Sequence, residues 1–426
     1  MGLQSADLRS SFTPTGAPRL PWLTPMRGLA IAMIVFYHVV IPIYGIPWFA
    51  HPRNDWPDLA ARVAQLRPLP QESPLHFILA NLFRYLGWIG YQGTGVFLAI
   101  SGFGLTWALV SRSRSAAIDL RAFYMRRFLR LFPLYWVGHL FFLIFNNLSG
   151  WRPFSPLDPR FALSLLGLRF LPDVFHFISP AWWFIVLIMQ LYAVFPLLWA
   201  ALRRFGLLRF WIGAALIAFA SRWVGFFLLP VDREMWSRGL LFTSRLAEFG
   251  LGMGLAWWAA GDLARVEGLF RTRTSMAALA LLYGAGLALS FTRLGAVFAP
   301  TLLTIAMGGF MIWICRDLLP RLSPLQNLLA GMGRYSYGIM VFHQPILWSF
   351  IVGTWPLALS LPVRLLAIGV VVAGIALGSA VVESGVNWLL QRPPLSRVFP
   401  PPGPYAIAPA LGSAERLEIS PQNPLQ

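Results

Sequence analysis

The chain has 426 residues, of which 57% are hydrophobic and only 12% are charged, and its mean hydropathy is +0.64. Because a soluble domain carries about 25% charged residues, this composition excludes a soluble globular protein. It predicts an integral membrane protein with an all-α, polytopic fold. Apolar segments and short connections use up nearly all the length, which leaves no room for a sizeable soluble domain.

The net charge of +18 comes entirely from arginine, because the sequence contains no lysine. The arginines lie between apolar segments, as the excess of basic residues in cytoplasmic loops requires, so the charge does not indicate nucleic-acid binding. Membrane lipids with anionic headgroups are expected partners. The single cysteine, Cys315, excludes an intrachain disulfide and a cysteine-based metal site. No metal site is expected.

About ten segments are apolar and long enough to cross a bilayer, since roughly 20 residues span the hydrocarbon core. They are 26–44, 75–110, 131–147, 181–201, 210–229, 240–260, 275–291, 299–315, 335–352 and 362–390. The connection richest in arginine, 111–130, is expected in the cytoplasm, which places both termini there too. The Pro-containing stretch 316–334 is expected as a loop. We predict a disordered cytoplasmic N-terminus (1–20), a transmembrane domain (21–392) and a disordered cytoplasmic tail (393–426).

The first apolar segment carries two ionisable residues, Arg27 at its start and His38 in its interior. They are eleven positions apart, so on a helix they lie on nearly the same face and about 16 Å apart along the axis. They cannot touch each other, but a long bound molecule could contact both. An ionisable residue inside a span is by default a functional candidate. The alternative is that His38 is a neutral packing residue and Arg27 marks the cytoplasmic end.

Arg127 and Arg130, in the stretch RRFLRLFPLYW, are three positions apart and share a helix face. Two guanidinium groups on one face form a clamp suited to phosphate or pyrophosphate. The alternative is a cluster of arginines that only stops the helix at the membrane surface.

Two further stretches contain candidate residues. Ser101, followed by Gly102, could present a hydroxyl to a substrate, although glycines in a span also serve helix packing. Arg245 and Glu248 are three positions apart, and they could pair with each other or orient a substrate or His38.

The stretch YSYGIMVFHQPIL contains His343 inside an apolar segment, which makes it the second histidine predicted within the membrane. Tyr335, at the start of the same stretch, is counted with His343 among the residues that support the site.

Taken together, these stretches resemble the family-3 membrane acyltransferases, which O-acetylate bacterial surface glycans and related acceptors. The similar stretches, in order, are RGLAIAMIVFYH, GTGVFLAISGFGL, FYMRRFLRLFPLYW, WWFIVLIMQLYAVFPLL and YSYGIMVFHQPIL. The segment RLAEFGLGMGLAW is also similar. Ile188 and Met189 stand where many members have adjacent glutamates, which indicates a different subgroup.

The resemblance implies a ten-helix acyltransferase domain that takes an acyl group from cytoplasmic acyl-CoA. It implies that Arg27 and His38 form the essential pair, with His38 catalytic, and that Arg127 and Arg130 bind the donor. Acyl transfer to a hydroxyl requires a base, a stabilised oxyanion and a positioned donor. Imidazole exchanges protons near neutral pH and suits the base.

We therefore expect an acyl-CoA-dependent O-acyltransferase in a bacterial inner membrane, with acetyl-CoA as the expected donor. The acceptor is expected to be a hydroxyl of a glycan, a lipid-linked saccharide or a related molecule, and no permanently bound cofactor is expected. The alternative is a transporter or flippase of an anionic lipid-linked precursor, in which the same residues bind without covalent chemistry. A structural partner in polysaccharide export is a third class.

Overall fold

The computed structural model describes residues 20–50, 52–71, 73–111, 113–354 and 361–392. These residues form helices and connections without any β-strand. Of the segments expected to be disordered and cytoplasmic, 1–20 and 393–426, all but Leu20 lie outside the described residues, and Leu20 is buried.

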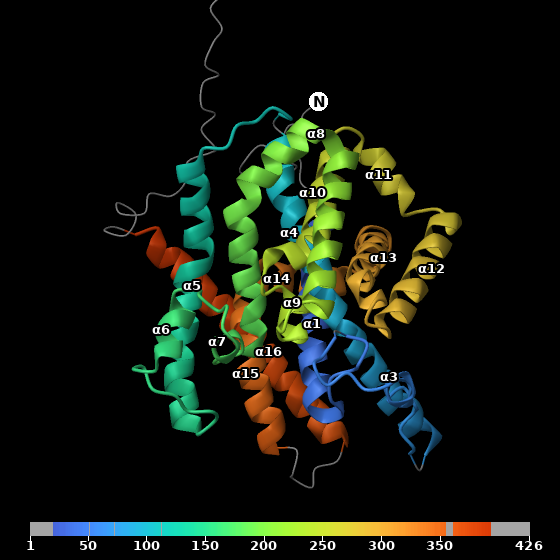
Figure 1. Cartoon of the computed structure of the whole chain (residues 1–426). Helices are drawn as coiled ribbons and strands as arrows, with labels where there is room; N and C mark the ends of the chain where they lie inside the picture. Colours follow the sequence, from blue (N-terminus) through green and yellow to red (C-terminus); the bar gives the residue numbers. More distant parts are fainter. Residues whose placement is uncertain (1–19, 51, 72, 112, 355–360, 393–426) are drawn as a thin grey trace, which may run out of the picture.

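Sixteen α-helices make up the described part of the chain (Figure 1). They are α1 (Leu23–Tyr44), α2 (Leu59–Ala64), α3 (Pro74–Ile89), α4 (Gly93–Val110), α5 (Leu120–Ser149), α6 (Pro159–Leu165), α7 (Pro172–Phe175), α8 (Trp183–Phe227), α9 (Arg233–Arg238), α10 (Leu246–Ala259), α11 (Leu263–Leu269), α12 (Arg273–Ser290), α13 (Ala299–Trp313), α14 (Ser323–Arg334), α15 (Ser336–Thr354) and α16 (Leu361–Leu390).

Six helical segments in the described part are long and apolar enough to cross a membrane, which confirms a helical membrane protein. They are Leu23–Tyr44, Pro74–Val110, Leu120–Ser149, Pro180–Phe227, Ala299–Arg321 and Val363–Leu390. Three other predicted spans fall on α10, α12 and α15, which are shorter or less apolar.

Two of the predicted spans, 181–201 and 210–229, lie in α8. The helix is interrupted at Gly206, whose φ of 75° and ψ of 174° are not helical. Glycine adopts such a backbone conformation without steric penalty. Figure 1 shows α8 turning back on itself near the top of the view, so that its two halves lie as a hairpin. The connection predicted between these two spans is therefore a single bend of the helix at Gly206.

The connections between the predicted spans lie at two opposite ends of the molecule. The loop 113–119, the bend of α8 and helix α11 lie near the top of Figure 1, whereas the loops 45–50 and 150–158 lie in its lower half. The upper end holds most of the basic connections, and we call it the arginine-rich end.

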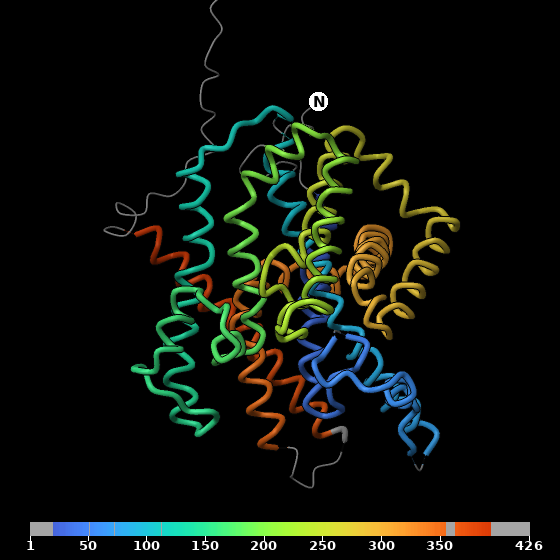
Figure 2. Tube along the Cα trace, in the orientation of Figure 1, coloured from blue at the N-terminus to red at the C-terminus, as the bar shows by residue number. Residues whose placement is uncertain are grey.

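The stretch 316–334 is not simply a loop, because residues 323–334 form α14 and this helix packs against α1. Two glycines make this contact close. A Cβ at Gly28 would overlap the carbonyl oxygen of Leu329, and a Cβ at Gly333 would overlap that of Thr24. We predicted a loop here because 316–334 contains charged residues and prolines, and the sequence therefore offered no sign of a helix. In Figure 2, α1 and the chain from α14 to α15 lie side by side although about 300 residues separate them.

Helix α4 packs in the same manner against α10. A Cβ at Gly252 would overlap the carbonyl oxygen of Ala99, and a Cβ at Gly102 would overlap that of Phe249. Small residues at such positions let helix backbones approach each other in a membrane. Helices α1, α4 and α10 thus form a tightly packed centre around which the site residues are arranged.

We predict that Gly333→Ala lowers the free energy of unfolding by about 1–3 kcal/mol, because the added methyl group forces α14 away from α1. Gly331→Ala is the matched control in the same helix. No atom lies within 4 Å of a Cβ at that position, and alanine is the better helix former. Thermal unfolding of the detergent-solubilised variants would measure the difference. Equal stability of the two variants would contradict this account of the α1–α14 contact.

Candidate functional site

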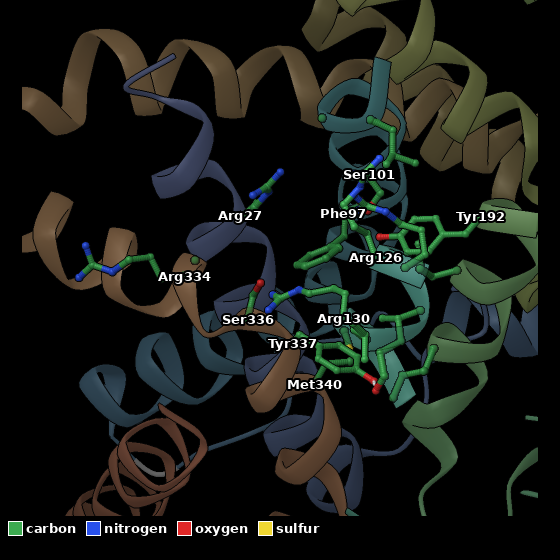
Figure 3. A pocket seen from close by; sticks show the side chains of 18 of the residues that line it. Arg27, Phe97, Ser101, Arg126, Arg130, Tyr192, Arg334, Ser336, Tyr337 and Met340 are labelled. Atoms are coloured by element: carbon green, nitrogen blue, oxygen red, sulfur yellow. Dashed lines mark hydrogen bonds between the residues drawn. The ribbon is translucent and has the colours of Figure 1, made fainter. Parts of the chain in front are cut away.

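A large basic cavity of about 710 Å³ opens among α1, α4, α5, α8 and α15 (Figure 3). Its lining contains no aspartate or glutamate. The arginines that line it are Arg27, Arg126, Arg127, Arg130 and Arg334. Figure 3 shows Arg27 extending from α1 toward Ser101 of α4, whereas Arg334 points the opposite way. A water-accessible cavity with this charge is suited to a large anionic ligand.

The predicted arginine clamp lies in this cavity, but its two members have different surroundings. Arg130 donates to Glu383 of α16 over 2.6 Å, and Glu383 also accepts from the backbone N–H of Gly338. Arg127 instead lies over the ring of Tyr192, with its guanidinium carbon 5.5 Å from the ring centroid. Arg127 forms no ion pair with any described carboxylate, so its charge is available to a ligand.

Glu383 was missed by the sequence analysis. It is only 3% exposed and is the only carboxylate in α16, a predominantly apolar helix. A lone carboxylate in such a span is the signal that could have identified it.

Ser101 lines the basic cavity, and its hydroxyl donates to the carbonyl oxygen of Phe97 over 2.9 Å. Tyr335 lines neither the basic cavity nor the second cavity described below; its hydroxyl accepts a long bond from Ser384. Two positions later, Tyr337 lines the basic cavity and donates to the carbonyl oxygen of Leu131. Of the two tyrosines in this stretch, Tyr337 lines the basic cavity and the predicted Tyr335 does not.

His38 and His343 lie in direct contact, although 305 positions separate them. His38 Nδ1 and His343 Nε2 are 3.1 Å apart, and the ring centroids are 4.8 Å apart. His343 is fully buried and His38 is 8% exposed. In addition, Trp348 Nε1 donates to the carbonyl oxygen of His38, which attaches α15 to α1 a second time. The sequence offered no sign that these two residues form a pair.

The hydrogen-bond partners of the two rings define their tautomers. His343 Nδ1 lies 2.8 Å from the carbonyl oxygen of Ile339, so this nitrogen must carry the proton. In the neutral ring, His343 Nε2 then has a lone pair and accepts. His38 Nδ1 lies between that lone pair and the carbonyl oxygen of Ile34, 2.9 Å away, so it must donate. His38 Nε2 is consequently left with an unprotonated lone pair and has no partner among the described residues.

A second, smaller cavity of about 80 Å³ is lined by His38 and lies toward the end opposite the arginine-rich one. Its wall combines residues of α1, α4, α8, α9 and α13 with the loop after α1. The polar side chains in its lining are Tyr37, His38, Tyr91, Gln92, Thr94, Ser237, Arg238, Arg245, Ser290 and Thr304. His38, but not the buried His343, is therefore accessible from a polar cavity that is separate from the basic one.

Arg245 and Glu248 lie near each other, but they do not form the close pair that their spacing suggested. Arg245 Nε and Glu248 Oε2 are 3.9 Å apart. The close partner of Glu248 is Arg222 of α8, at 2.6 Å, and Thr301 donates to the same carboxylate oxygen over 2.9 Å. Arg222 lies on a different helix, which local sequence spacing could not reveal.

The described residues contain no group of three or more His, Cys, Asp or Glu side chains that could hold a metal ion.

A comparison with protein-family models matches residues 20–382 to the acyltransferase family 3 model, described as an acyltransferase domain. Searches of curated proteins and of solved structures gave no match. The family match includes α1 with both Arg27 and His38, the paired arginines of α5, and α15 with His343. The chain therefore belongs to acyltransferase family 3 and is a multi-pass membrane acyltransferase that acts on hydroxyl groups.

Proposed function

We propose that this protein transfers an acyl group, with acetyl as the expected group, from acyl-CoA to a hydroxyl, and that His38 is the general base. The observation that carries the proposal is the position of two cavities along α1: the basic cavity at Arg27 and the polar cavity at His38. A donor bound at one and an acceptor bound at the other would meet within the same helix bundle.

The basic cavity has the chemistry that coenzyme A requires. Coenzyme A carries a pyrophosphate and a 3′-phosphate, and guanidinium groups bind phosphates through charge-assisted hydrogen bonds. We assign Arg27 and Arg127 to the phosphates, because neither forms an ion pair with a described carboxylate. Arg130 contributes with less net charge, because Glu383 already binds it.

The pantetheine arm of the donor is long enough to cover the roughly 16 Å between the positions of Arg27 and His38 on the helix. Phe97 and Phe184 line the basic cavity, and their ring centroids are 5.6 Å apart in an edge-to-face arrangement. On this proposal the thioester passes these rings to reach the imidazole.

In the reaction, the acceptor hydroxyl gives its proton to His38 Nε2 while its oxygen attacks the thioester carbonyl. The tetrahedral intermediate then collapses, the C–S bond breaks, and the thiolate of CoA takes the proton from the imidazolium. His343 accepts from His38 Nδ1 throughout, so it holds the ring in the basic tautomer. This is the role that an orienting group plays beside a catalytic histidine. We propose that the acceptor is a glycan or lipid-linked saccharide at a bacterial inner membrane.

We predict that His38→Ala abolishes acyl transfer and leaves donor affinity unchanged, because His38 lines the second cavity and not the donor cavity. The purified chain in nanodiscs would be given radiolabelled acetyl-CoA with a membrane glycan extract, and CoA binding would be titrated in parallel. Transfer that persists in His38→Ala would refute the base role. Neither transfer nor CoA binding by the wild type, across several acyl-CoAs and extracts, would favour a transporter.

For His343, we predict that His343→Phe lowers kcat by about 100-fold or more. The carbonyl oxygen of Ile34 still accepts from His38 Nδ1, but the side-chain acceptor that orients the ring and stabilises its protonated form is lost. His343→Gln offers a carbonyl oxygen at a similar reach and should recover part of the rate. CoA affinity should be the same in both variants. Equal rates for the Phe and Gln variants would show that the residue only fills space.

In the donor cavity, we predict that Arg127→Gln weakens CoA binding about tenfold, the loss expected for one charge-assisted hydrogen bond. Arg204→Gln is the matched control, because Arg204 is exposed in α8 near the bend and does not line the cavity. Isothermal titration in uncharged nanodiscs at two salt concentrations would measure both. If both variants bind CoA as the wild type does, Arg127 does not bind the donor phosphates.

A further inference from the structure

The cavity beside His38 has an excess of positive charge that no described residue neutralises. Arg238 pairs with Glu234 at 2.5 Å, which makes that pair neutral. The remaining carboxylate nearby is Glu248, which is fully buried and lies between Arg222 and Arg245. Two guanidinium groups and one carboxylate leave a net charge of +1.

Arg245 is the group that carries this unbalanced charge. Arg222 is the one closely bound to Glu248, and it also donates to the carbonyl oxygens of Ser244 and Val297. Arg245 lines the cavity, its side chain is 9% exposed, and its Nε has no hydrogen-bond partner. Burying a charge without a partner is costly, so an anion at this position would be strongly favoured.

Other polar atoms in the same lining also lack partners. Tyr37 Oη and Gln92 Oε1 are buried and make no hydrogen bond, and their side chains belong to residues only 6% and 4% exposed. The amide of Gln92 is held in place, because it donates to the hydroxyl of Tyr283 over 3.1 Å. A buried polar atom without a partner costs about 1–3 kcal/mol. The atoms are thus a donor, an acceptor and a cation arranged around one cavity.

We infer that the cavity binds an acceptor that carries a carboxylate or phosphate close to the hydroxyl that is acylated. Arg245 binds the anion, Tyr37 and Gln92 bind polar groups of the same molecule, and the hydroxyl meets His38 Nε2. Sugar acids and sugar phosphates have this chemistry. The inference rests on the proposed function for the assignment of the hydroxyl. The anion site itself follows from the unbalanced charge of Arg245 and from the buried polar atoms of Tyr37 and Gln92 that lack partners.

The test uses the full chain in nanodiscs of uncharged phosphatidylcholine, without acyl-CoA. Two matched pairs of probes differ only in the anion: D-glucuronate with D-glucose, and myo-inositol 1-phosphate with myo-inositol. We expect at least one anionic probe to bind about tenfold or more tightly than its neutral partner. Arg245→Gln should abolish that preference and Arg245→Lys should restore part of it. Arg293→Gln, which removes a charge from the turn after α12 and does not line the cavity, should leave it intact.

Several outcomes would overturn the inference. These are equal binding within both pairs, including no binding at all, or a preference that survives Arg245→Gln. Displacement of the probes by added phosphatidylglycerol, dependent on Arg245, would assign the site to a lipid headgroup instead. Because binding is measured without the donor, a failure here is distinct from a failure of acyl transfer in the wild type, which would count against the proposed function alone.

Discussion

One hydrogen bond, between the buried imidazoles of His38 and His343, connects the first helix of the chain with α15. Each ring also has its Nδ1 beside a carbonyl oxygen of its own helix, so neither ring can rotate without losing a bond. In a membrane interior those losses are not replaced by water. The pair therefore couples the packing of α1 on α15 to the tautomer of His38. The packing of the two helices and the position of the proton on His38 thus depend on the same contact.

The other charged side chains divide into those that have close partners within the protein and those that lack them. Arg222 is neutralised by Glu248, and Arg130 by Glu383. Arg169 is fully buried and donates to the carbonyl oxygens of Phe175 and Phe177, which fastens the segment between α6 and α8. These satisfied cations stabilise the fold. Arg27, Arg127 and Arg245 lack such close partners, and all three line cavities. We propose that this distinction separates structural arginines from binding arginines in a chain whose only basic side chains besides histidine are arginine.

The sequence allowed the individual site candidates to be found but not their pairing. An ionisable residue in an apolar span is unusual whatever surrounds it, so Arg27, His38 and His343 could be identified from local sequence alone. Which of them touch depends on how helices distant in the chain pack. Local spacing suggested Arg245 as the partner of Glu248, yet Arg222 on another helix is closer. The contact between α14 and α1 escaped detection for the same reason, since it depends on glycines on both helices.

The separation of the two cavities along α1 has an energetic rationale. If coenzyme A is the donor, as we propose, moving its phosphates through the apolar interior would require removing several charges from water, at a cost of many kcal/mol for each. Moving an anionic acceptor inward would carry the same penalty. If each charged molecule stays at its own end, held by arginines there, the uncharged thioester is the part that has to approach His38. On the proposed function, the phenyl rings of Phe97 and Phe184 present no such barrier to an acyl group on a flexible uncharged arm. On the proposed function, the arginines of the two cavities hold the charged parts of donor and acceptor outside the apolar interior, and only uncharged groups have to meet at His38.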